Sequence, residues 1–325
     1  MTRCLVTGAT GFVGRALVSK LRASGAFVRG MARHAGDTLL ADEFIAADLA
    51  SLPDDTRAFE DVDVVVHLAA KTHDMTEAPG VEDEYQRINV EGTRRLVAAS
   101  TRARVRRVVF VSSVKVIDEG NRQAANEQTP PRPLTPYGRS KLEAEQLVSA
   151  AAATGEFESV CLRFPLVYGP GQSGNLQRML GAIRRHRFPP PPDNGNQRSM
   201  VHVDNAVQAL LLAVSASAAS GRTYLVTDAR PYSTREVYEA ARRALGRSPS
   251  RVAVPEAAFR LLAAGGEVAR RVIGRRVGFD SDAFEKLLGS AAYDSGRIQR
   301  ELGYSPSRDL IGSMPALVDD ERAVH

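Results

Sequence analysis

A tyrosine and a lysine stand four residues apart at the predicted start of a helix, at Tyr137 and Lys141. Four residues make about one helical turn, so both side chains emerge on one face of the helix. A lysine ammonium beside a phenol favours phenolate, so we expect the pKa of Tyr137 to fall below its usual value of about 10. Ser113 ends a predicted buried strand, where its hydroxyl can hold a carbonyl or alkoxide oxygen. Together these three residues predict acid–base catalysis at a carbonyl or alcohol.

The elements that must position these residues alternate between strands and helices. The segment Val62 to Ala70 is a nearly continuous apolar run, as in a strand buried on both faces of a parallel sheet. The pattern predicts strands over 3–7, 27–31, 62–70, 108–113 and 160–163, with a further strand in 43–48, and helices over 15–24, 82–103 and 137–153. Repeated βα units of this length predict an α/β fold with a doubly wound parallel sheet, a Rossmann fold.

The composition changes after Pro170, where glycine, proline and asparagine interrupt the regular βα alternation. We expect residues 1–169 to form a dinucleotide-binding domain, completed by about 200–228 and its strand at 224–227. A smaller C-terminal α/β lobe for substrate is expected from 170–199 and 229–325, with helices over 234–245 and 255–273.

A glycine-rich turn joins the first strand to the first helix, with the sequence TGATGFVG from Thr7 to Gly14. This is the context that a dinucleotide-binding loop requires. Gly8 allows the tight turn, Gly11 lets the backbone approach a pyrophosphate, and Gly14 lets the helix pack closely on the strand. The loop therefore predicts a nicotinamide dinucleotide, with Gly8, Thr10, Gly11, Phe12 and Val13 among its contacts.

The end of the second strand bears on the choice between NAD and NADP. An acidic residue there would hold a ribose 2′-hydroxyl, whereas an arginine accommodates a 2′-phosphate. This chain has Ala32 followed by Arg33, which favours NADP(H) over NAD(H), although Arg33 can instead stack on the adenine. Asp48, paired with Leu49 after the third strand, is the candidate partner of the adenine amino group.

The overall composition restricts the partners. The net charge of +5 comes from basic residues spread along the chain, which argues against a nucleic-acid partner. The two cysteines, Cys4 and Cys161, lie in apolar runs, indicating neither a disulfide nor a metal site. No signal-peptide pattern and no apolar stretch of about 18 residues is found, so we expect a cytoplasmic protein without stable membrane insertion.

These residues occur in motifs that resemble the extended short-chain dehydrogenase/reductase family, of the NAD-dependent epimerase/dehydratase type. The resemblance covers nearly the whole chain. The matching segments are TGATGFVG (7–14), HLAA (67–70), NVEGT (89–93), VSS (111–113), YGRSK (137–141), RFPLVYGPG (163–171) and RSMVHVDN (198–205).

The resemblance implies roles for individual residues. Ser113, Tyr137 and Lys141 match the family's catalytic triad, and Lys141 would also hold the nicotinamide ribose. Further cofactor contacts are implied at Leu68, Ala69 and Ala70, and the segment from Phe164 to Val167 would line the nicotinamide. Asn175 and Arg198 match positions that usually contact the nucleotide diphosphate of the substrate, although Arg198 can instead form an ion pair between the lobes.

Departures from the family pattern indicate the reaction. Dehydratases of this type carry an Asp-Glu pair directly after the catalytic serine or threonine position, to remove water from the sugar. This chain has Val114 and Lys115 there, so we do not expect a dehydratase. The segments 71–75 and 188–199 resemble bacterial reductases that act on UDP-2-acetamido-4-keto-2,6-dideoxyhexoses in making sugars for lipopolysaccharide O-antigen. In that case Lys71 and His73 lie near the hexose, although both can instead belong to a surface loop.

Three functions remain open at this point. The first is an NADPH-dependent UDP-sugar 4-reductase, and the second is a UDP-hexose 4-epimerase (UDP-glucose or UDP-GlcNAc type) that uses the same three residues with a tightly held cofactor. The third, a non-catalytic dinucleotide sensor, predicts a broken triad, whereas this triad is intact. Family members often dimerise through helices corresponding to 82–103 and 137–153, so a homodimer is expected.

Overall fold

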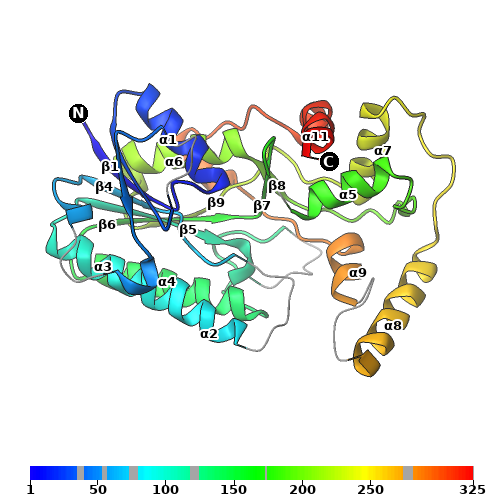
Figure 1. Ribbon diagram of the computed structural model, residues 1–325, viewed down its shortest axis with the longest axis horizontal. Coiled ribbons are helices and arrows are strands. Elements are labelled where there is room, and N and C mark those ends of the chain that lie inside the picture. The colour runs from blue at the N-terminus through cyan, green and yellow to red at the C-terminus, as the bar shows by residue number, and fades with distance from the viewer. Residues whose placement is uncertain are drawn as a thin grey trace.

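The computed structural model describes residues 1–34, 40–52, 57–72, 80–117, 124–172, 174–273 and 281–324 (Figure 1). The described residues form a parallel sheet of seven strands in the order β3-β2-β1-β4-β5-β6-β9. Its strands are β1 (Arg3–Thr7), β2 (Phe27–Ala32), β3 (Glu43–Ala46), β4 (Val64–His67), β5 (Arg107–Ser113), β6 (Glu158–Phe164) and β9 (Arg222–Leu225). The α/β, doubly wound Rossmann class predicted from the sequence is confirmed.

Helices cover both faces of this sheet. Helices α1 (Phe12–Ala23) and α6 (Val203–Ser215) pack on one face, while α3 (Gly92–Arg102) and α4 (Pro136–Ala153) pack on the other (Figure 1). The strand β4 shows why its sequence is continuously apolar: Val64 and Val66 point into the first core and Val65 into the second. Because successive side chains of a strand alternate in direction, a strand buried on both faces has no polar side.

A buried arginine fixes α6 against the sheet. Arg107, at the start of β5, is 1% exposed and donates from Nη1 to the carbonyls of Ala213, Val214 and Ala216 at the end of α6. Its Nε donates to Glu158 at the start of β6 over 2.7 Å. A cation at a helix C-terminus satisfies carbonyls that have no partner within the helix.

The rest of the chain builds a second group of elements. β7 (Leu166–Tyr168) and β8 (Met200–His202) form a small parallel sheet, and α5 (Asn175–Arg184), α7 (Thr234–Ala244) and α11 (Leu310–Val324) share one apolar core. The remaining helices are α8 (Glu256–Ile273), α9 (Ser281–Leu288) and α10 (Gly296–Leu302). In Figure 1, α8 and α9 lie beyond the carboxyl edge of the large sheet.

Asp228, just after β9, links the large sheet to these elements. Its carboxylate is 1% exposed and accepts hydrogen bonds from the hydroxyls of Tyr168 and Tyr232 and from the Asn205 side chain. It also accepts from the backbone N–H of His202. The four hydrogen bonds lower the pKa of Asp228, but burial has the larger effect and raises it.

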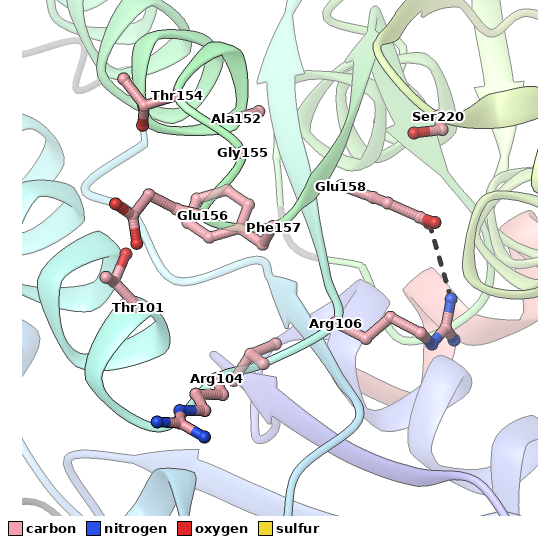
Figure 2. A pocket seen from close by; sticks show the side chains of 11 residues that line it. Thr101, Arg104, Arg106, Ala152, Thr154, Gly155, Glu156, Phe157, Glu158 and Ser220 are labelled. Carbon is pink, nitrogen blue, oxygen red and sulfur yellow. Dashed lines mark ion pairs between the residues drawn. The ribbon is translucent and has the colours of Figure 1, made fainter.

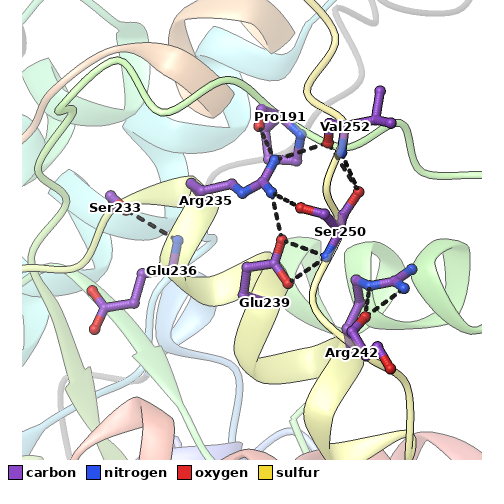
Figure 3. A network of polar contacts seen from close by, with 9 residues as sticks. Pro191, Ser233, Arg235, Glu236, Glu239, Arg242, Ser250 and Val252 are labelled. Atoms are coloured by element: carbon purple, nitrogen blue, oxygen red, sulfur yellow. Dashed lines mark hydrogen bonds and ion pairs between the residues drawn. The ribbon is translucent and has the colours of Figure 1, made fainter.

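An arginine network fastens the segment before α8 to α7 (Figure 3). Arg235 donates to the carbonyls of Pro191, Ser250 and Val252 and pairs with Glu239 at 2.7 Å. The Glu239 carboxylate also accepts from the Ser250 backbone N–H. The segment has no regular secondary structure, so these side-chain hydrogen bonds satisfy backbone groups that neighbouring strands would pair in a sheet.

Several boundaries differ from the sequence expectations. The apolar run 62–70 contains only four residues of strand, Val64–His67, because the chain leaves the sheet at Leu68. The predicted helix over 82–103 is divided into α2 (Val81–Tyr85), a π-helical segment (Gln86–Glu91) and α3. Helices α5, α6, α9, α10 and α11 and strands β7 and β8 were not predicted from the sequence. No helix among the described residues is long and apolar enough to cross a membrane.

Candidate active site

The glycine loop leaves the carboxyl end of β1 in a conformation that only glycines tolerate. Gly8 has φ of 69°, in the left-handed region, and a Cβ added there would lie 2.9 Å from the Ala69 backbone N. A Cβ on Gly14 would lie 2.2 Å from the Gly8 carbonyl oxygen, so α1 can approach β1 this closely only with glycine. Gly11 is the N-cap of α1 and leaves the first N–H groups of that helix without a side-chain cap. The loop therefore fits an anionic pyrophosphate.

The neighbouring strand ends lie at the same edge of the sheet. Arg33 directly follows β2 and is exposed, and no partner of its guanidinium is found among the described residues. Asp48 follows β3, where its Oδ1 accepts from the Ala50 N–H at 3.0 Å, and Leu49 beside it is buried. Leu68, Ala69 and Ala70 continue from β4 and are half-buried. These residues follow the carboxyl ends of β2, β3 and β4, at the edge of the sheet where ligands bind in this fold.

Helix α4 brings Tyr137 against the end of β5. Thr135 caps the helix by accepting from the Gly138 N–H at 3.1 Å, and Pro136 occupies its first turn. A Cβ on Gly138 would lie 2.3 Å from the carbonyl oxygen of Lys115, so the helix start touches the turn that follows Ser113. The Tyr137 and Ser113 side chains are hydrogen-bonded in this arrangement. The structure thus joins two residues that are 24 positions apart in the sequence.

Burial raises the pKa of Tyr137 to about 12, although the Ser113 hydrogen bond acts in the opposite direction. The Tyr85 ring, on α2, lies 5.8 Å from the Tyr137 ring between centroids. The sequence-based prediction that Lys141 lowers this pKa is wrong for the structure. Desolvation on burial is the largest influence on the pKa of Tyr137.

Lys141 is 3% exposed and donates from Nζ to the Val111 carbonyl at 2.7 Å. Its Nζ also lies 4.3 Å from the centroid of the Phe110 ring. Burial lowers the pKa of Lys141 to about 8, because an ammonium loses its hydration there. Lys141 is therefore a group that titrates near physiological pH, with a charge that depends on its neighbours.

A hydrogen-bonded network connects the segment after β4 to the catalytic helix. The Asn89 side chain accepts from the Lys71 N–H at 2.8 Å and donates to the Lys71 carbonyl at 3.1 Å. It also donates to Ser140 Oγ at 2.9 Å, and that hydroxyl donates to the Tyr137 carbonyl. Asn89 lies in the π-helical segment, whose wider turn sets its position.

His67, at the end of β4, is buried between two hydroxyls. Its Nδ1 lies 2.8 Å from Thr7 Oγ1 and its Nε2 lies 3.1 Å from Thr93 Oγ1. The Thr93 hydroxyl donates its single proton to the Asn89 carbonyl, so it accepts from the His67 Nε2–H, and the unprotonated Nδ1 accepts from the Thr7 hydroxyl. Burial lowers the pKa of His67 to about 3, so the ring stays neutral and links the glycine loop to α3.

The expected substrate residues lie in different environments. Lys71 pairs with Glu84 of α2, with 2.6 Å between Nζ and Oε2, and its side chain is 22% exposed. Asn175 is exposed at the start of α5, where its Oδ1 accepts from Arg178. The Arg198 Nη1 donates to the carbonyls of Glu285 and Gly289 at the end of α9. His73 lies outside the described residues.

The two residues expected to line the nicotinamide follow each other closely at the end of β6. Phe164 is the last residue of that strand and is 4% exposed, while Val167 is half-buried in β7. Phe164 is paired in register with Ser113 of β5. The predicted nicotinamide contacts are therefore adjacent to the predicted catalytic serine.

Comparison with known proteins gives the family. Residues 4–227 match the family model described as NAD dependent epimerase/dehydratase family. The chain belongs to this family. The match covers the glycine loop, all seven strands of the large sheet and the triad. Members use a nicotinamide dinucleotide, which agrees with the glycine loop from Gly8 to Gly14.

Individual relatives extend over nearly the whole chain. A UDP-glucose 4-epimerase of Vibrio cholerae is 29% identical, over 94% of this chain and 91% of its own length. The human short-chain dehydrogenase/reductase family 42E member 1 is 30% identical, over 92% of this chain and 83% of its own length. A solved structure, MoeE5 in complex with UDP-glucose and NAD, is 29% identical with a TM-score of 0.79 and covers 99% of both chains.

Two contributors to the site were not predicted as site residues. Tyr85 packs beside Tyr137, and Asn89 joins Lys71 to the catalytic helix. Asn89 opens the NVEGT motif, so the motif was a signal for it, and Tyr85 stands one helical turn before it. The contact of Tyr85 with Tyr137 depends on how α2 packs on α4, which no local pattern in the sequence specifies.

A hollow of about 680 Å³ lies at the opposite edge of the sheet (Figure 2). It is lined by residues near the amino ends of β5 and β6, including Arg104, Arg106, Glu156 and Glu158, and Arg106 pairs with Glu158. Ligands of open α/β sheets bind at the carboxyl ends of the strands. The hollow is therefore separate from the candidate active site.

Proposed function

We propose that this family member is an NADPH-dependent UDP-sugar 4-reductase acting on a UDP-2-acetamido-4-keto-2,6-dideoxyhexose. The observation that carries the proposal is the strand end at Ala32 and Arg33. The position that would hold a ribose 2′-hydroxyl has no carboxylate, and an exposed guanidinium stands next to it. An arginine there suits a 2′-phosphate, and NADPH is the usual donor for biosynthetic reductions.

The bound cofactor supplies a hydride to C4 of the keto sugar. Tyr137 donates its phenolic proton to the carbonyl oxygen, and its raised pKa keeps that proton in place at neutral pH. Ser113, hydrogen-bonded to Tyr137, holds the same oxygen. As the phenol loses its proton, the Lys141 ammonium on the same helical face stabilises the developing negative charge.

The remaining expected contacts are assigned by the same proposal. The glycine loop residues Gly8, Thr10, Gly11, Phe12 and Val13 hold the pyrophosphate, and Asp48 with Leu49 faces the adenine. Leu68, Ala69, Ala70, Phe164 and Val167 line the path to the nicotinamide, and Lys141 holds its ribose. Asn175 and Arg198 contact the UDP diphosphate, and Lys71 and His73 lie beside the hexose. Arg198 is already anchored through Nη1, so it presents a fixed cation.

The proposal includes where and how the enzyme works. We propose a cytoplasmic homodimer that contributes to O-antigen or related polysaccharide sugars. Cys4 and Cys161 are free thiols, as suits a reducing compartment. The proposed dimer interface is formed by residues 82–103, which span α2, the π-helical segment and α3, and by α4.

A UDP-hexose 4-epimerase is the second candidate, favoured by the relatives. The Vibrio cholerae relative is a UDP-glucose 4-epimerase, and the MoeE5 structures hold NAD with UDP-glucose or UDP-glucuronic acid. An epimerase would retain its cofactor between turnovers, whereas a reductase must exchange it.

Purified enzyme decides between the two. We expect little retained nicotinamide cofactor, and stoichiometric oxidation of added NADPH when the UDP-4-keto-6-deoxyhexosamine is supplied, with slower oxidation of NADH. The control is the same reaction without sugar. Tightly retained NAD, together with interconversion of UDP-GlcNAc and UDP-GalNAc, contradicts the reductase and establishes the epimerase.

A further inference from the structure

Four side chains meet on one face of the sheet behind the active site. Lys141 and Glu145 are one turn apart on α4, and Cys161 and Arg163 are two apart on β6. Residues one turn apart share a helical face, and alternate strand residues share a sheet face. The cluster therefore lies between the catalytic helix and the strand that carries Phe164.

Glu145 is held in a fixed orientation by this cluster. Its two carboxylate oxygens accept from Arg163, with 3.0 Å from Nε to Oε1 and 2.7 Å from Nη2 to Oε2. The two side chains are 7% and 10% exposed, for Arg163 and Glu145 respectively. The Cys161 thiol donates a further hydrogen bond to Glu145. A bidentate pair of this kind fixes the orientation of the carboxylate as well as pairing its charge.

Lys141 faces charged and titratable groups from three elements. These are Cys161 on β6, Glu145 on its own helix and His67 on β4, while Arg163 pairs with Glu145. The His67 ring is neutral, and burial raises the pKa of Cys161, so that thiol is also neutral. Glu145 is thus the anion that offsets the cost of burying the Lys141 ammonium.

We propose that Glu145, oriented by Arg163 and Cys161, is a positioning residue that keeps Lys141 positively charged at its buried place, one helical turn from Tyr137. The proposal rests on the proposed function, in which a charged Lys141 stabilises the tyrosinate. The positive charge of Arg163 partly cancels the negative charge of Glu145, so Glu145 raises the pKa of Lys141 only in part. The pKa therefore stays below the usual value of a lysine.

The chain has only five lysines, which makes Lys141 directly observable. Protein labelled with ¹³C at lysine Cε is titrated by NMR between pH 6 and pH 11, and Lys141 is assigned by its absence from Lys141→Arg. The wild-type Lys141 signal is expected to titrate near pH 8. In Glu145→Gln its midpoint falls by about one pH unit, since a nearby opposite charge shifts a pKa by about one to three units.

Two further variants test the direction of the shift in the Lys141 midpoint and provide a control. Arg163→Gln removes the cation that neutralises Glu145, so the Lys141 midpoint rises. If Glu145→Gln fails to fold, this variant carries the test. Glu158→Gln removes the carboxylate of another arginine pair, Arg107–Glu158, at the opposite end of β6. It is expected to leave the Lys141 titration unchanged.

An unchanged Lys141 midpoint in folded Glu145→Gln, or a fall or no change in Arg163→Gln, overturns the proposal. The titration needs no substrate and no turnover. Its failure would therefore leave the proposed reaction standing, and failure of the reductase assay would leave this titration interpretable.

Discussion

Burial sets the protonation of the residues proposed to move the proton. Tyr137 keeps its proton because burial raises its pKa to about 12, and Lys141 holds its charge weakly because burial lowers its pKa to about 8. The YxxxK spacing shows that both side chains lie on one helical face, but their pKa values depend on Tyr85, Phe110 and β6. Those neighbours come from elsewhere in the chain, so their effect on the tyrosine could not be predicted from the motif.

At the scale of single residues, Arg33 provides a prediction about the choice between NADPH and NADH. Arg33→Ser should weaken NADPH binding roughly tenfold or more, because a hydrogen bond to a charged group contributes about 1.5–3 kcal/mol. NADH binding should change little. Dissociation constants for both cofactors measure this, with the exposed Arg260→Ser of α8 as a matched control. Equal losses for NADH and NADPH would show that Arg33 stacks on adenine and does not read the 2′-phosphate.

At the scale of elements, the start of α4 is placed by a close backbone contact. The sequence predicted this helix over 137–153, one residue short of its start at Pro136, and the strand before it ended at Ser113 as expected. The approach of Gly138 to the Lys115 carbonyl was not predictable, because it depends on how the helix packs on the turn after β5. This contact keeps Tyr137 within hydrogen-bond reach of Ser113.

Gly138→Ala tests that contact. Glycine-to-alanine changes inside helices usually stabilise, by up to about 1 kcal/mol. Here the added Cβ meets a backbone oxygen, so we expect a loss of about 1–3 kcal/mol in the free energy of unfolding and a marked fall in kcat. Denaturant unfolding and steady-state assays measure both, with the exposed Gln146→Ala of the same helix as control. A variant as stable and active as the wild type would show that the packing here is loose.

Across the whole molecule, the large sheet was predictable, whereas in the second group of elements only the helices α7 and α8 were predicted. A continuous apolar run such as Val64–Val66 identifies a buried strand from its composition alone. Strands β7 and β8 have three residues each and show little periodicity. Asp228 shows why: its partners Tyr168, Asn205 and Tyr232 come from three separate segments. The site likewise combines both groups, since Phe164 and Ser113 lie on the large sheet and Arg198 lies beside α9.

The most direct test of the account follows one deuterium atom. NADPH deuterated at C4 of the nicotinamide, with each face labelled in turn, is given to the enzyme with the UDP-4-keto-6-deoxyhexosamine, and the product is examined by NMR and mass spectrometry. We expect one deuterium at C4 of the reduced sugar from one of the two faces. Tyr137→Phe should bind the cofactor but transfer deuterium at least about a hundredfold more slowly. An unlabelled product, or full transfer by Tyr137→Phe, would contradict hydride transfer assisted by this tyrosine.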